Sequence, residues 1–388
     1  MPLFEYNIPS NIVIGNDIDN RIGEISNKLG DKVIIVLENS KYISDNRIGE
    51  KIESSIGIFT NNIIVYDEIE RSANNDIKID NLKEIVESAR PDVIVGVGGY
   101  HVLSVAKMVA SIYDKILSND DVFKKRYTQF RRKRVSYIEV PITFGIVPGL
   151  SKFCFVYEKS SGYKTIYSDV YSYADAIIFD TSLISVLPPY YVGILAVDAM
   201  ALAFDAFISR NSNPISDAFS FKAIETFFVN IKKFTNEPSN INILHNLCYA
   251  GVMASMSISL SSPGLSTAIS QAVNSVLDIP SERISSVIFP HIIDYNLTSV
   301  PGKLIQTAMA LGERIQDITV IEAAIKSAES IRKLLMDLNV PLRLSEIEDF
   351  DEKKIDKISD IASKYDFMAF LPRSASRNEI NALLQAAI

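Results

Sequence analysis

The stretch ILAVDAMALAFDAF, residues 194–207, is apolar at almost every position. A run of this kind is typical of a helix that is buried on most of its sides. Two acids, Asp198 and Asp205, interrupt it. A buried carboxylate costs free energy unless a cation or several hydrogen-bond donors meet it, so Asp198 is expected to have a partner. That partner is either structural, such as a helix end or a basic side chain, or part of a functional site.

The sequence on the two sides of this stretch has different patterns. From about residue 187 onward it has helical period, with breaks expected at Pro214, Pro238, Pro263, Pro280, Pro290, Pro301, Pro341 and Pro372. Before it, β-rich runs at 11–15, 32–37, 62–66, 92–97 and 135–140 alternate with helical patterns at 18–29, 78–89 and 103–113. Such alternation predicts a parallel sheet covered by helices. We therefore predict an α/β domain over residues 1–183 and an all-helical domain over 184–388.

Composition and charge exclude several classes of protein. The chain has 388 residues, of which 47% are hydrophobic, and this is enough for two cores. The net charge of -8 argues against a nucleic-acid binder, which normally carries a basic face. The basic run at 124–134 is interpreted as a solvated surface.

The cysteines and the N-terminus indicate the compartment. Cys154 and Cys248 form neither a disulfide framework nor a metal-binding pattern, which fits a reducing cytoplasm. The first ten residues lack the basic and apolar regions of a signal peptide. No apolar run reaches about 18 residues without a charge. We expect a cytoplasmic protein that neither spans nor binds a membrane.

The end of the run at 92–97 is a candidate phosphate-binding turn. Gly98 and Gly99 follow this predicted strand and precede a predicted helix. Free backbone N–H groups at such a turn commonly hold phosphates, although glycines are also used for the turn alone. Glu38 ends the second predicted strand, where an acid can accept hydrogen bonds from an adenosine ribose. The alternative for Glu38 is an ordinary exposed loop acid.

Several stretches, taken in order, resemble the iron-containing alcohol dehydrogenases and their glycerol and glycerol-1-phosphate dehydrogenase relatives. These are IPSNIVIGNDIDNRIGEISNKLGDKVIIVLEN at 8–39, VIVGVGGYHVLSVAK at 93–107, PITFGIVPGLSKF at 141–153, AVDAMALAFDAF at 196–207 and FLPRSASRNEINALLQ at 370–385. The second is similar to the family's G-G-G-S-x-x-D-x-A-K and the third to its P-T-T-x-G-T-G-S-E. The resemblance implies a dehydroquinate synthase-like fold, with a Rossmann-like dinucleotide-binding domain, a helical domain and a catalytic cleft between them.

The resemblance also implies a metal site, from which this sequence departs. Family members hold iron or zinc with an Asp and two or three His residues of the helical domain, and Asp198 is the only matching ligand position. The positions of the family's histidines are occupied here by Leu202, Thr267, Gln271 and Ser281. One carboxylate with hydroxyls is a poor site for these metals, so no metal is expected. Instead we expect Asp198 to be hydrogen-bonded to Thr267, Gln271 or Ser281, directly or through water.

The cofactor motif is changed as well. Gly98, Gly99, Thr143 and Gly145 match the family, whereas Tyr100 replaces the third glycine of the turn and His101 follows it. A Cβ at the third position costs about 1–2 kcal/mol in a left-handed conformation. His101 is a candidate phosphate contact or a surface turn residue. NAD or NADP is therefore a candidate cofactor, and Glu38 favours NAD because its carboxylate repels a 2′-phosphate.

Two classes of function follow. In the first, the chain is an NAD(P)-linked alcohol or polyol dehydrogenase-type oxidoreductase without the usual metal. Its cleft candidates are Asp198, Thr267, Gln271 and Ser281, and its cofactor-binding candidates are Glu38, Gly98, Gly99, His101, Thr143 and Gly145. In the second, it is a non-catalytic relative that binds a ligand or a partner protein. The expected partner is a small molecule in the interdomain cleft, and a homo-oligomer is compatible with the sequence.

Overall fold

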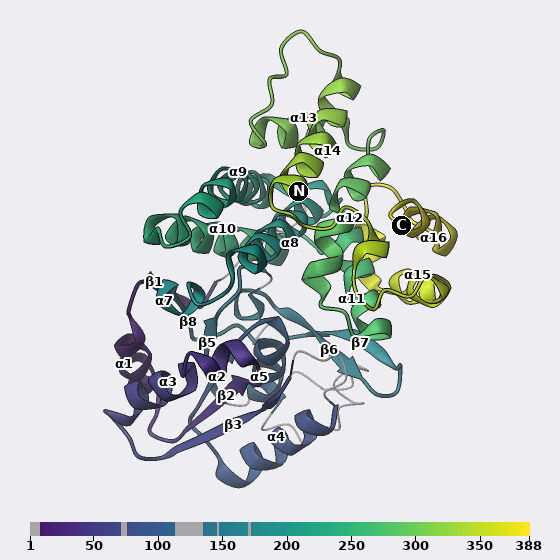
Figure 1. Cartoon of the computed structure of the whole chain (residues 1–388). Coiled ribbons are helices and arrows are strands. Elements are labelled where there is room, and N and C mark those ends of the chain that lie inside the picture. The colour runs from purple at the N-terminus through teal and green to yellow at the C-terminus, as the bar shows by residue number, and fades with distance from the viewer. Residues whose placement is uncertain (1–7, 71–75, 113–134, 146, 170–171) are drawn as a thin grey trace. The chain divides into compact units, whose positions relative to one another are not determined.

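The structure, a computed structural model, describes residues 8–70, 76–112, 135–145, 147–169 and 172–388 (Figure 1). The chain forms two compact units. One contains Met1–Thr143 and Val147–Val186, and the other contains Phe144–Ile146 and Leu187–Ile388. The basic run at 124–134 lies outside the described residues. The predicted α/β and all-helical architectures are both confirmed.

The α/β unit contains a six-stranded parallel sheet in the order β1-β8-β5-β4-β2-β3. Its strands are β1 (Asn11–Gly15), β2 (Val33–Glu38), β3 (Ile63–Ile69), β4 (Val93–Gly98), β5 (Ser136–Pro141) and β8 (Ala176–Asp180). The order places β2 beside β4 and β4 beside β5. The carboxyl ends of these three strands, at Glu38, Gly98 and Pro141, are therefore neighbours.

Helices cover both faces of this sheet, which explains why β2, β4 and β8 are buried at every position. Helices α1 (Asp19–Leu29), α2 (Lys41–Asp45) and α3 (Ile48–Gly57) share one apolar core with Val33, Ile35, Val93 and Val95. Helix α5 (Tyr100–Ile112) packs on β4 and β5, and α4 (Asp76–Ala89) packs on α5.

The structure contains a small second sheet that local sequence patterns did not predict. Strands β6 (Phe153–Glu158) and β7 (Tyr163–Ser168) form an antiparallel hairpin. The short helix η1 (Pro148–Leu150) precedes it in the chain, and the short helix α7 (Thr181–Ile184) follows β8. Polar and apolar residues are mixed in YKTIYS at 163–168, because this hairpin is only partly buried.

The helical unit is built around α8 (Pro189–Ile208), which contains the stretch 194–207 (Figure 1). Helix α8 packs against three of its neighbours, α9 (Pro214–Asn236), α10 (Ile241–Leu260) and α12 (Ser281–Tyr295). The remaining helices are α11 (Leu265–Leu277), α13 (Pro301–Ala310), α14 (Val320–Asp337), α15 (Ile355–Ala362) and α16 (Arg377–Ala386). Among the described helices, α8 and α10 match membrane spans in length and composition, but 89% and 72% of their apolar windows are buried inside the protein, as in core helices.

The expected break at Pro290 is wrong, because Pro290 lies inside α12. A proline in a helix removes one backbone hydrogen bond. Here the neighbouring side chains Phe289, Ile292 and Ile293 are fully buried, and this packing holds the helix continuous. Pro214 and Pro301, by contrast, occupy the first positions of α9 and α13, as the sequence predicts.

Candidate functional site

The predicted phosphate turn is present between β4 and α5, and an acid already occupies one of its N–H groups. Glu38 Oε2 accepts a hydrogen bond of 2.6 Å from the backbone N–H of Gly99, and the Glu38 side chain is buried. Gly98 has a φ of 141°, and a Cβ there would lie 2.6 Å from the Cβ of Glu38. Glu38 is therefore not an exposed loop acid. It stabilises the turn, and its carboxylate occupies the N–H group of Gly99.

The residues after the turn contact the β6–β7 hairpin. The backbone N–H of Phe155 donates to the Tyr100 hydroxyl at 2.6 Å. Lys164 Nζ lies 2.7 Å from His101 Nδ1, and Lys164 is almost completely buried. His101 is thus held by a buried ammonium group. Lys164 was not predicted from the sequence. The pattern that could have identified it is a lysine within the partly apolar strand β7.

A cavity of about 240 Å³ lies at the carboxyl end of β2. It is lined by residues 37–40 and by parts of α2 and α3, and Asp67 of β3 completes it. The cavity has room for a nucleoside-sized group. Two acids besides Glu38, namely Glu50 and Asp67, make its lining acidic, while Arg47 is ion-paired with Glu50.

Thr143 and Gly145, both predicted to bind cofactor, have different neighbours. Thr143 is buried close to the turn, since a Cβ on Gly99 would lie 3.4 Å from its methyl group. Gly145 lies beside Asp198, because a Cβ on Gly145 would be 3.0 Å from Asp198 Oδ2. The Gly145 carbonyl also accepts a hydrogen bond of 3.3 Å from the Ser255 hydroxyl.

Asp198 belongs to a polar cluster in the helical unit, which we define as Asp198, Ser285, Glu282 and Tyr191. The Ser285 hydroxyl donates to Asp198, and the Tyr191 hydroxyl donates to Glu282. Burial raises the pKa of Asp198 to about 7, with further increases from Glu282 and Asp205, while the Ser285 hydrogen bond lowers it. Part of the Asp198 surface remains accessible. Asp198 is thus a carboxyl group that gains or loses a proton near neutral pH.

The predicted direct partner of Asp198 is wrong. Its donor is Ser285, one helical turn after Ser281 on α12, whereas Thr267 bonds to Asp205. The reason is geometric, because Asp205 lies two turns further along α8, opposite the start of α11. Gln271 is buried, and its Oε1 has no hydrogen-bond partner among the described residues.

Asp205 stabilises the N-terminus of α11. Its carboxylate accepts from the backbone N–H groups of Gly264, Ser266 and Thr267 at 3.2, 3.3 and 3.0 Å, and from the Thr267 hydroxyl at 3.0 Å. Burial raises the pKa of Asp205 to about 6, and these hydrogen bonds lower it. Here the structural interpretation of a buried acid applies.

We expect Asp205→Ala to destabilise the protein, because the substitution leaves these buried donors without an acceptor. Each stranded donor costs about 1–3 kcal/mol, so a loss of at least about 3 kcal/mol is expected in urea unfolding. Asp205→Asn keeps one acceptor oxygen and should lose less. Equal stability of the alanine variant and the parent protein would contradict this role.

The donor set around Asp198 does not meet the ligand preferences of zinc or ferrous iron. In the part of the chain that the structure describes, no three His, Cys, Asp or Glu side chains are grouped to hold a metal ion. Leu202 presents a hydrocarbon side chain one turn after Asp198, and Ser285 supplies only a hydroxyl. Such metals prefer imidazole, thiolate or several carboxylates.

Two buried charged side chains, Lys107 and Glu139, support the loop that follows Thr143. Lys107 Nζ, on α5, donates to the carbonyls of Pro148, Ser151 and Phe153 at 2.8, 2.6 and 3.3 Å. Glu139 of β5 accepts from the Gly149 N–H at 2.6 Å. Both side chains are fully buried. Burial raises the pKa of Glu139 to about 7, and the Lys107 charge lowers it.

Comparisons with known proteins agree with this architecture. Residues 9–181 match the family described as iron-containing alcohol dehydrogenase, and residues 195–388 match the C-terminal domain of the same family. The chain is 23% identical to a 1,3-propanediol dehydrogenase of Klebsiella pneumoniae, over 99% of both chains. It is 26% identical to a sulfoacetaldehyde reductase of Bilophila wadsworthia, over 79% of this chain and 80% of that one.

Solved structures show the same fold. A 1,3-propanediol oxidoreductase superimposes over 100% of both chains with a TM-score of 0.90 at 21% identity. A sulfoacetaldehyde reductase from Bifidobacterium kashiwanohense, solved in complex with NAD+, covers 99% of this chain and 98% of its own, with a TM-score of 0.83 at 19% identity.

Proposed function

Because the chain belongs to the iron-containing alcohol dehydrogenase family, we propose that it interconverts a small alcohol and its aldehyde or ketone with a nicotinamide dinucleotide, and that it does so without a catalytic metal. The curated relatives named above are dehydrogenases and reductases of small alcohols and aldehydes. In the proposed reaction, a specific acid takes the role of the metal.

The observation that carries the proposal is the Asp198–Ser285 pair. A carboxyl group whose pKa lies near the working pH is well suited to general acid–base catalysis. Asp198 has a pKa raised to about 7 and remains partly accessible, and its Oδ1 accepts from the Ser285 hydroxyl, which leaves Oδ2 to carry the transferable proton. In carbonyl reduction, Asp198 gives its proton to the carbonyl oxygen, and in alcohol oxidation its carboxylate takes the hydroxyl proton.

The α/β unit contains a fitting site for one half of the dinucleotide. When bound, the dinucleotide supplies or accepts the hydride. The cavity at residues 37–40 and Asp67 would hold the adenosine group, and the ribose would meet acceptor oxygens. Binding of the diphosphate requires Glu38 to release the Gly99 N–H.

We expect NAD to bind more tightly than NADP. Glu38, Glu50 and Asp67 line the cavity, and their negative charges disfavour a 2′-phosphate. Calorimetric titration of the purified protein with both dinucleotides measures the difference. Tighter binding of NADP would contradict the placement of the adenosine group in this acidic cavity.

A second candidate function is a non-catalytic ligand-binding protein. The hydrogen bond between Glu38 and Gly99 favours it, because a carboxylate there repels a phosphate group. A thermal-shift screen with NAD, NADP, other adenine nucleotides and divalent metals separates the two candidates, since a ligand at 100 times its Kd adds about 2.7 kcal/mol of stability. Stabilisation by a nucleotide other than a dinucleotide would favour the second.

The direct test is a metal-free assay of dinucleotide-coupled turnover. NADH oxidation is followed with sulfoacetaldehyde and short aldehydes, and NAD reduction with 1,3-propanediol and butanol. We expect turnover with at least one member of this panel. Dinucleotide binding without turnover on any of them would contradict the enzymatic proposal and leave the binding function.

A further inference from the structure

Tyr100, which replaces the third glycine of the turn, contacts the β6–β7 hairpin. It is the first residue of α5 and its backbone is helical, so it avoids the left-handed conformation in which a Cβ costs free energy. Its hydroxyl accepts a hydrogen bond of 2.6 Å from the backbone N–H of Phe155 on β6. The centroids of the Tyr100 and Phe155 rings are 6.4 Å apart. Tyr100 therefore meets the hairpin with both its ring and its hydroxyl.

These contacts satisfy the second edge of strand β6. Along its first edge β6 pairs with β7, and among the described residues it pairs with no other strand. Phe153 and Phe155 are buried and two residues apart, so their backbone groups point to the same edge. There the Lys107 ammonium donates to the Phe153 carbonyl at 3.3 Å, and the Tyr100 hydroxyl accepts from Phe155. Side chains of α5 thus take the place of a third strand, which leaves fewer backbone groups unpaired.

The hairpin also brings an amino group to the start of α5. Lys164 of β7 is 1% exposed, and its Nζ lies 2.7 Å from Nδ1 of His101, the second residue of α5. The N-terminus of a helix carries partial positive charge and is the end at which phosphates are commonly held. The turn at Gly98 and Gly99 comes directly before it. The docking of the hairpin on α5 therefore fixes Lys164 next to the candidate phosphate turn.

We propose that Tyr100 is a positioning residue for dinucleotide binding, and that it acts by fixing the β6–β7 hairpin against the start of α5. The Tyr100 hydroxyl holds the backbone of Phe155, and the same hairpin carries Lys164 to His101 beside the turn. Without the hydroxyl, the N–H of Phe155 loses its acceptor and the hairpin opens more often. This inference rests on the proposed dinucleotide site. It predicts that a glycine at position 100 weakens binding, although glycine is the residue of the motif.

Two variants of Tyr100 test the proposal in the full chain. Tyr100→Phe removes only the hydroxyl, and Tyr100→Gly restores the glycine of the motif. We expect hydrogen exchange of residues 153–168 to be at least about fivefold faster in Tyr100→Phe, because a stranded N–H shifts the local opening equilibrium by at least this factor. Exchange in the helical unit should stay the same. We expect the affinity for NAD, measured by calorimetry, to fall by a similar factor in both variants.

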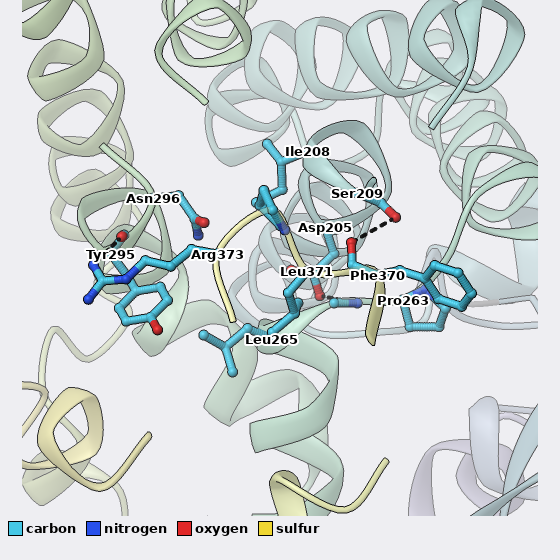
Figure 2. A pocket seen from close by; sticks show the side chains of 12 residues that line it. Asp205, Ile208, Ser209, Pro263, Leu265, Tyr295, Asn296, Phe370, Leu371 and Arg373 are labelled. Atoms are coloured by element: carbon cyan, nitrogen blue, oxygen red, sulfur yellow. Dashed lines mark hydrogen bonds between the residues drawn. The ribbon is translucent and has the colours of Figure 1, made fainter. Parts of the chain in front are cut away.

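Two further Tyr→Phe variants are matched controls. In the α/β unit, the hydroxyl of Tyr137 donates to the Leu103 carbonyl at 3.0 Å, so Tyr137→Phe removes a buried hydroxyl that bonds to α5 and not to the hairpin. In the helical unit, Tyr295 lines a small cavity (Figure 2), and its hydroxyl donates to the Ser374 carbonyl at 2.7 Å. Both controls should lower the midpoint of thermal unfolding and keep the NAD affinity of the parent protein. They separate positioning from a general loss of stability.

Three results would overturn the proposal: unchanged exchange of residues 153–168 in Tyr100→Phe, tighter NAD binding by Tyr100→Gly than by the parent, or an equal loss of NAD affinity in Tyr137→Phe. The second result would show that the Tyr100 ring occupies space that the dinucleotide needs. If the parent protein itself binds no dinucleotide, the proposed function fails, and hydrogen exchange alone decides the role of Tyr100. Faster exchange of the hairpin in Tyr100→Phe then keeps Tyr100 as its anchor, and unchanged exchange excludes that role.

Discussion

Asp198→Asn is expected to lower the rate of carbonyl reduction by about 10²–10⁴-fold, which is the usual contribution of a general acid. The amide has nearly the same shape as the acid and can still meet the Ser285 hydroxyl, but it has no transferable proton near neutral pH. Initial rates of NADH oxidation with saturating aldehyde measure the effect. A variant that keeps more than about a tenth of the parent rate would show that Asp198 is not the general acid.

The pH dependence separates catalysis from a structural role. Reduction by the parent protein needs the protonated acid, so its rate should fall as pH rises through about 7, the pKa of Asp198. The residual rate of Asp198→Asn should lack this step. Its stability should change by only about 1 kcal/mol or less at pH 6, because a hydrogen-bonding side chain of the same size is retained.

The free energy of unfolding should also depend on the protonation of Asp198. Burial raises the folded-state pKa of Asp198 to about 7, above that of the unfolded chain, so the folded protein binds more protons between these values. The stabilising contribution is complete below the unfolded pKa and is lost as pH rises through about 7. Urea unfolding from pH 5 to pH 8 should therefore show Asp198→Asn gaining stability relative to the parent.

Lys107→Met is expected to destabilise the protein by about 3–5 kcal/mol at pH 8, since removing this buried positive charge leaves the buried negative charge of Glu139 uncompensated. Lys107 donates to three loop carbonyls and lowers the pKa of Glu139. At pH 5 Glu139 is protonated in both proteins, so only the carbonyl contacts are lost and the difference should be smaller. Urea unfolding at the two pH values measures both.

Lys28→Met is the matched control for this experiment. Lys28 lies in the last turn of α1, in the same unit, and is exposed. Its replacement should change stability by less than about 0.5 kcal/mol, as is usual for surface substitutions. If the two lysine variants were equally stable, or if the loss for Lys107→Met did not depend on pH, the Lys107–Glu139 coupling would be refuted.

Much of the architecture was predictable because it depends on local patterns. The buried strands at 33–38 and 93–98 are nearly continuous apolar runs, and the turn at Gly98 needs a conformation that glycine favours. The hairpin β6–β7 and the continuous helix through Pro290 were not predicted. Both depend on tertiary packing, which a local pattern does not contain.

The hydrogen-bond partners of the candidate residues were not predictable from the sequence. Asp198, Glu38 and Thr267 all lie in polar contacts, yet each has a partner that spacing alone did not identify. Asp198 and Asp205 are seven residues apart on α8 and differ only in what lies opposite. Ser285 reaches Asp198 because α12 packs on α8, and a register drawn from one sequence cannot fix this contact.

The central claim is that the reaction needs no metal, and one measurement tests it most directly. The purified protein is treated exhaustively with a chelator, its zinc and iron contents are determined by elemental analysis, and NADH-dependent aldehyde reduction is measured before and after. We predict less than about a tenth of an equivalent of either metal and an unchanged rate, because Leu202, Thr267, Gln271 and Ser281 offer neither imidazole nor thiolate. About one equivalent of metal per chain, lost together with activity on chelation and restored by readdition, would contradict the account.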